Sequence, residues 1–97
     1  MPQHDLYHFS VTIHSDDLAA VYALRGLSQH AQRTGNARIP WGGTKRLDWE
    51  QAGHQVTFHF SEPEYRVGFI RDAKRLLPQQ IFTVVRERDD HPATPQS

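Results

Sequence analysis

Alternation of apolar and polar residues predicts two strands in this chain. In residues 7–14 and 55–60, apolar side chains occupy every second position and polar side chains fill the positions between them. This period of two is typical of a strand with one buried face and one open face. The apolar positions are Tyr7, Phe9, Val11, Ile13, Val56, Phe58 and Phe60. We expect these two strands to lie side by side at the centre of a sheet.

Two longer segments have the apolar spacing of amphipathic helices. In residues 16–34, Ala20, Leu24, Leu27 and Ala31 recur at intervals of four and three. Residues 62–77 carry a similar stripe that begins at Tyr65. A stripe of this kind covers one side of a helix and indicates packing against a sheet.

Two less regular segments complete the predicted fold. Residues 44–50 are interpreted as a strand with Leu47 and Trp49 on one face. Residues 81–86 form a nearly continuous apolar run and are interpreted as the last strand. The order strand, helix, strand, strand, helix, strand predicts a ferredoxin-like βαββαβ sandwich of the α+β class. Right-handed crossovers then give a four-stranded antiparallel sheet in the order 4-1-3-2, with two helices on one face.

The length of the chain sets the number of domains. Its 97 residues suffice for one hydrophobic core and are too few for two. We predict a single α+β domain over residues 6–88 and a flexible N-terminus over residues 1–5. Residues 89–97 have little to bury, so a disordered C-terminal tail is expected there.

Composition excludes several classes of site. The chain has no cysteine, which rules out disulfides, thiolate nucleophiles and cysteine-based metal sites. The N-terminal residues lack the basic start and apolar run of a signal peptide, and no stretch approaches the roughly 20 apolar residues of a membrane span. We therefore expect a small cytoplasmic protein without a membrane partner. Its formal charge is zero, so electrostatic attraction must be regional.

One region is strongly basic. Residues 18–47 contain five Arg or Lys and no Asp or Glu, and Trp41 stands there beside two glycines. An aromatic ring that stacks on a base, flanked by cations that contact phosphates, is typical of single-stranded nucleic-acid binding. The predicted DNA- or RNA-binding residues are Arg33, Arg38, Trp41, Lys45 and Arg46. The alternative interpretation is that Trp41 folds back to close one end of the core.

The polar face of the two central strands gives a second candidate surface. Its residues are His8, Thr12, Thr57 and His59, and they suit a homodimer contact or a small-ligand site. His8 and His59 could share an ion across the strands, but a third ligand is missing unless His14 or a partner subunit supplies it. We accordingly predict no metal and no cofactor.

The sequence offers fewer features of an enzyme than of a binding protein. The serines lack the glycine context of a nucleophile elbow, and the chain has no phosphate-binding glycine loop. A cleft histidine, His8 or His59, could still act as a base near neutral pH, which leaves an enzyme as a further alternative. The sequence favours a small non-enzymatic binding module with nucleic acid as its partner.

Overall fold

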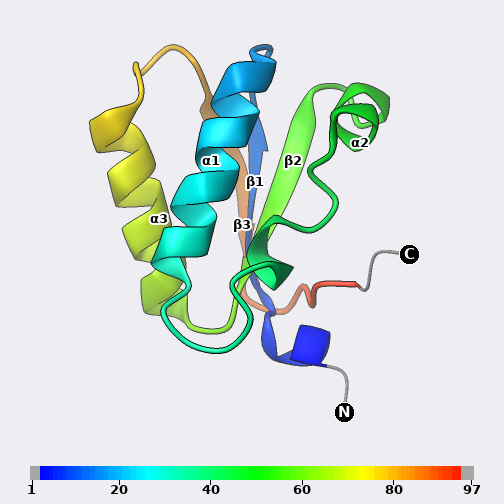
Figure 1. Ribbon diagram of the computed structural model, residues 1–97, viewed down its shortest axis with the longest axis vertical. Coiled ribbons are helices and arrows are strands. Elements are labelled where there is room, and N and C mark those ends of the chain that lie inside the picture. The colour runs from blue at the N-terminus through cyan, green and yellow to red at the C-terminus, as the bar shows by residue number, and fades with distance from the viewer. Residues whose placement is uncertain (1–2, 95–97) are drawn as a thin grey trace.

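The computed structural model describes residues 3–94 of the chain. A three-stranded antiparallel sheet forms the centre, and two long helices cover one of its faces (Figure 1). The strands are β1 (Phe9–His14), β2 (Gln55–Phe60) and β3 (Thr83–Arg88), in the order β2-β1-β3. The helices are α1 (Leu18–Ala31), α2 (Arg46–Gln51) and α3 (Pro63–Leu76), with short 3-10 turns η1 (Gln3–Leu6) and η2 (Ile39–Trp41). The α+β class agrees with the sequence prediction.

The two cleanly alternating segments are neighbours, as predicted. In the β1–β2 ladder, Val11 lies opposite Phe58 and Ile13 lies opposite Val56. The run after α3 becomes β3 and pairs with the other side of β1, where Val84 lies opposite Ile13. The register of this second ladder shifts between Thr12 and Ile13. β1 is therefore the central strand.

The hydrophobic core lies between the sheet and the two long helices. The apolar residues of β1 and β2 meet Leu24 of α1 and Phe69 of α3. The Phe69 ring centroid is 4.9 Å from that of Phe58 and 5.2 Å from that of Phe60. Five of the predicted inward residues of these strands, namely Val11, Ile13, Val56, Phe58 and Phe60, are buried. Phe9 is only half-buried, at the edge of this core.

The predicted strand over residues 44–50 is wrong, and with it the four-stranded ferredoxin-like sheet in the order 4-1-3-2. Residues 46–51 form α2, and only Trp49 of its apolar residues enters the core, while Leu47 stays 63% exposed. The segment consists largely of good helix formers. Arg46 and Glu50 also form an ion pair at 2.9 Å with the i, i+4 spacing of neighbours on a helix. These local preferences outweigh the weak alternation of Leu47 and Trp49.

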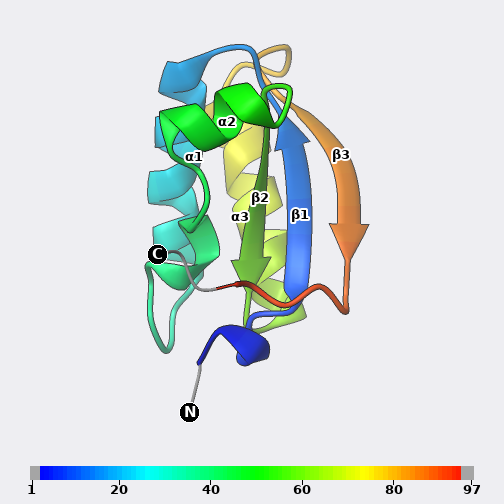
Figure 2. The same ribbon diagram turned by 90° about the vertical axis from the view of Figure 1, so that its right-hand side faces the viewer.

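The segment from η2 to α2 lies along the outer side of β2, where the missing strand would have paired (Figure 1, Figure 2). η2 contacts both β2 and α1, and α2 contacts β2. Ile39 is buried against Tyr7 and Ala93 in a small second cluster. The outer edge of β2 is thus flanked by helical turns.

The chain after β3 turns back across one end of the open face of the sheet (Figure 2). The amide of His91 donates to the carbonyl of His8 at 2.9 Å, and the amide of Ala93 donates to the carbonyl of Tyr7 at 3.1 Å. Residues 89–94, which the sequence assigns to a disordered tail, are held there by these contacts. Residues 1–2 of the predicted flexible N-terminus and residues 95–97 of the predicted tail lie outside the described residues.

Candidate functional site

The face of the sheet opposite the long helices carries polar and basic side chains. Thr12 of β1 and Thr57 of β2 lie opposite each other, and their hydroxyls form a hydrogen bond of 2.9 Å. On β3, Arg86 lies opposite Thr12 and Arg88 lies opposite Ser10. Side chains that are directly opposite in a ladder share a face, so both arginines belong to this open face.

A groove runs between β2 and the segment of η2 and α2. One wall contains Arg38, Trp41 and Lys45, which the sequence assigns to nucleic-acid binding. The other wall contains Thr57 and His59, which the sequence assigns to the alternative surface on the sheet. Three members of the first set and two members of the second therefore line one groove.

The other two predicted nucleic-acid-binding residues lie elsewhere. Arg33 follows α1 and lines a separate hollow with Tyr65 of α3. Arg46 lines a hollow with Trp49 and Glu50. The hydrogen bond and the negative charge of Glu50 raise the pKa of Arg46 above its ordinary value.

Trp41 is anchored in the wall of the groove. Its ring is half-buried against the core, and the guanidinium carbon of Arg25 lies 4.5 Å from the ring centroid. The Thr44 hydroxyl donates to the carbonyl of Trp41, which fixes the backbone at this turn. The indole Nε1 is buried and has no hydrogen-bond partner among the described residues. Arg25 covers part of the ring, so Trp41 contributes only a limited surface to the groove.

The histidines of the predicted sheet-face site turn toward the C-terminal segment. His8 Nδ1 donates to the carbonyl of Asp89 at 2.6 Å, and His59 Nδ1 donates to the carbonyl of His91 at 2.8 Å. Ser10 lies opposite His59 in the ladder, and its hydroxyl is 3.0 Å from His91 Nδ1. Burial lowers the pKa of His59 from 6.5 to about 4, a shift that the hydrogen bond to His91 partly opposes.

Charge pairing differs between the two sides of the molecule. Among the described residues, Arg46 is the one cation of residues 18–47 with a carboxylate in ion-pair range. On α3, by contrast, Arg71 and Arg75 each lie 3.5 Å from Asp72. The buried guanidinium of Arg66 reaches Asp89 at 2.7 Å. Positive charge is therefore less neutralised around the groove than on α3.

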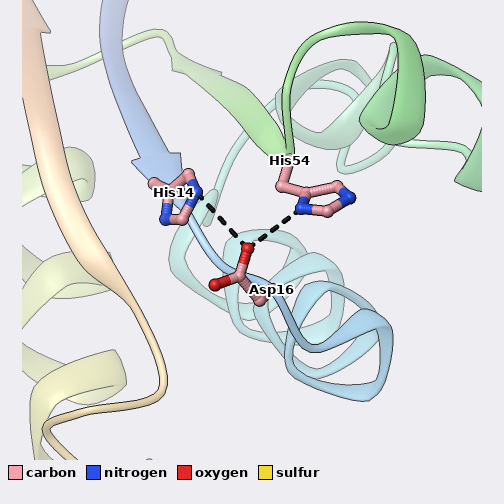
Figure 3. Close-up of side chains that lie close together, drawn as sticks. All are labelled: His14, Asp16 and His54. Carbon is pink, nitrogen blue, oxygen red and sulfur yellow. Dashed lines mark hydrogen bonds and ion pairs between the residues drawn. The ribbon is translucent and has the colours of Figure 1, made fainter.

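The structure also brings together three residues that the sequence interpretation did not combine. His14, Asp16 and His54 meet at the other end of the sheet, where both imidazoles point toward one carboxylate (Figure 3). Asp16 Oδ1 lies 2.9 Å from His54 Nδ1 and 3.5 Å from His14 Nε2. A signal for this cluster was present in the sequence, because pairing of residues 7–14 with residues 55–60 brings the end of the first strand beside the start of the second.

The described residues contain no helix with the length and apolar character needed to cross a membrane. Comparison of the chain with protein-family models, with curated proteins and with solved structures finds no match.

Proposed function

We propose that this chain is a non-enzymatic binding module that holds a single strand of nucleic acid across the open face of its sheet and the adjoining groove. The observation that carries this proposal is the placement of four cations. Arg38 and Lys45 lie along the groove beside β2, and Arg86 and Arg88 lie on β3. None of these four has a carboxylate partner in ion-pair range within residues 3–94.

The placement of these cations at the two sides of the sheet suits a backbone that crosses the strands. Neighbouring strands lie about 4.8 Å apart, so the two margins of a three-stranded sheet are separated by roughly 10 Å. The threonine pair between them offers hydroxyls to phosphate, sugar or base edges. Stacking contributes less than the sequence suggests, because Arg25 lies over the ring of Trp41. Phosphate contacts therefore dominate the proposed affinity, and such contacts weaken as salt rises.

Fluorescence anisotropy with a labelled single-stranded oligonucleotide tests the proposal. The measurement is repeated at salt concentrations from about 50 to 200 mM, because binding that depends on phosphate contacts weakens strongly over this range. The double variants Arg38→Ala/Lys45→Ala and Arg86→Ala/Arg88→Ala should each weaken binding. Each lost phosphate contact should also reduce the slope of log affinity against log salt by about 0.7. The matched control is Arg71→Ala/Lys74→Ala, which removes the same formal charge from the exposed side of α3.

Two results would count against nucleic-acid binding. One is the absence of binding to single-stranded DNA and RNA at low salt. The other is an equal loss of binding in the α3 control, which would show that only overall charge matters. In either case the sheet-face homodimer becomes the better hypothesis, and sedimentation velocity of the wild type and of Thr12→Arg would test it, because Thr12 lies at the middle of that face.

A further inference from the structure

We propose that His14, Asp16 and His54 form a binding site for a divalent ion of the zinc class. The three residues come from separate parts of the fold. His14 is the last residue of β1, Asp16 lies in the turn between β1 and α1, and His54 immediately precedes β2. One ligand atom from each residue lies within 4.8 Å of the other two.

The distances are close to those of a metal centre. Zinc–nitrogen and zinc–oxygen bonds of about 2.0 to 2.2 Å place tetrahedral ligand atoms roughly 3.4 Å apart. The observed separations from Asp16 Oδ1 are 3.5 Å to His14 Nε2 and 2.9 Å to His54 Nδ1. The two imidazole nitrogens lie within 4.8 Å of each other, so adjustments of these partly exposed side chains suffice to bring all three ligand atoms to these bond lengths.

The chemistry of the donors selects the class of ion. Two imidazole nitrogens and one carboxylate oxygen suit Zn²⁺ and its transition-metal neighbours, whereas Ca²⁺ and Mg²⁺ prefer oxygen ligands throughout. Each imidazole would bind through the nitrogen that now faces Asp16 and keep its proton on the other ring nitrogen. The carboxylate would supply one negative charge to the ion.

His54 is held in position by its surroundings. Its amide donates to the carbonyl of Trp49 at 2.9 Å, and its carbonyl accepts from the amide of Ser15 at 3.0 Å. The Trp49 and His54 rings are stacked, with centroids 4.3 Å apart and an angle of 21° between their planes. Gly53 and His54 both have left-handed backbone conformations, with φ of 67° and 65°. The ring of His54 is thus oriented by the backbone and by Trp49 before any ion binds, which lowers the cost of ordering a ligand.

The cluster opens onto a hollow, so a bound ion would keep a position free for water. His14, Asp16 and His54 line this hollow together with Gln80 and Thr83 from the segment around the start of β3. Three protein ligands and an accessible fourth position are typical of zinc sites that exchange a ligand with solvent. This site lies apart from the groove, so its test is independent of nucleic-acid binding.

The test is titration of the full chain with Zn²⁺ by isothermal calorimetry, and with Co²⁺ by visible absorption, which reports tetrahedral coordination. We expect one ion per chain. His54→Asn removes the imidazole while retaining a residue that tolerates the left-handed backbone, and Asp16→Asn removes only the charge of an exposed side chain. Each should weaken binding at least about 10-fold, the smallest effect expected even for partners of metal ligands.

His30→Gln is the matched control, because His30 is an exposed histidine on α1 away from the cluster. Its affinity for Zn²⁺ should equal that of the wild type, and circular dichroism should show that all variants retain the fold. The proposal is overturned if the wild type binds neither Zn²⁺ nor Co²⁺, or if Asp16→Asn and His54→Asn, both folded, bind as tightly as His30→Gln. In either outcome Asp16 is only a hydrogen-bond and ion-pair partner of the two imidazoles.

Discussion

The indole Nε1 of Trp49 donates a hydrogen bond of 2.8 Å to the carbonyl of Ser15. This contact joins α2 to the turn between β1 and α1, across 34 residues of sequence. Trp49 is also the residue through which α2 enters the core. The short helix is therefore attached to the sheet through one side chain that supplies both apolar packing and a buried hydrogen bond.

Trp49→Phe should separate these two contributions. The ring still fills much of the same space, but the Ser15 carbonyl loses its buried donor, so we expect a loss of about 1 to 3 kcal/mol in the free energy of unfolding. Urea denaturation measures this change. Leu47→Ala on the exposed side of the same helix is the control and should stay within about 0.5 kcal/mol of the wild type. Equal stability of Trp49→Phe and the wild type would show that the hydrogen bond is unimportant.

Phe58→Ala should be among the most damaging core substitutions. Phe58 is fully buried on β2 against Phe69, and its truncation leaves a cavity beneath α3. The expected cost is about 3 to 5 kcal/mol. A domain of this size has a total stability of about 5 to 15 kcal/mol, so the thermal midpoint should fall sharply. Val67→Ala, an exposed position on α3, should leave that midpoint nearly unchanged.

Trp41→Ala tests whether the ring of Trp41 supports the fold. Because the ring packs against the core, its removal should lower the free energy of unfolding by about 1.5 to 3 kcal/mol. A double-mutant cycle with Arg25→Ala should give a coupling of about 0.5 to 1 kcal/mol, the usual range for an exposed cation–π contact. An unchanged stability in Trp41→Ala would contradict packing and would favour a ring offered to a ligand.

His59 should make the fold sensitive to acid. The pKa of this histidine is lowered by burial from 6.5 to about 4, so between these two values the unfolded chain binds a proton that the folded chain does not. The contribution of His59 to the free energy of unfolding should be fully present above about pH 6.5. It should be lost as the pH decreases toward 4, which lowers the free energy of unfolding by roughly 1 to 3 kcal/mol after allowance for partial solvent exposure.

Urea denaturation at several pH values between 7.5 and 4.5 measures this dependence. His59→Gln should flatten the profile over that range, and His30→Gln should leave it unchanged because His30 is exposed on α1. A profile that is equally steep in His59→Gln and the wild type would assign the acid sensitivity to other groups.

The sequence predicted the fold correctly where a pattern extended over many residues and incorrectly where it rested on only two. The alternation around Val11 and Phe58 is long and regular, and the pairing derived from it is correct. In residues 44–50 only Leu47 and Trp49 suggested a strand, and the segment consists largely of good helix formers. These helix propensities, weighed against an alternation of only two residues, would have favoured a helix.

The candidate sites were less predictable because they depend on which segments meet in space. Because Lys45 and Arg46 are adjacent in sequence, they were expected to act together. In the structure Arg46 lines the hollow that also contains Trp49 and Glu50, whereas Lys45 lines the groove beside β2. Asp16 and His54 are 38 positions apart and meet only because β1 and β2 pair in one particular register. The alternation fixes which face of each strand is buried, but it does not distinguish registers that differ by two residues, so the sequence alone does not place these two side chains together.

The two edges of the sheet are unequal, and this limits how copies of the chain could join. The outer side of β2 is flanked by η2 and α2, whereas β3 ends the sheet on the other side with exposed charged residues at Arg86, Glu87 and Arg88. Filaments built by strand addition need two available edges on every molecule. If two copies paired through their β3 edges, neither copy would have a second open edge. Assembly by strand addition would therefore stop at a dimer.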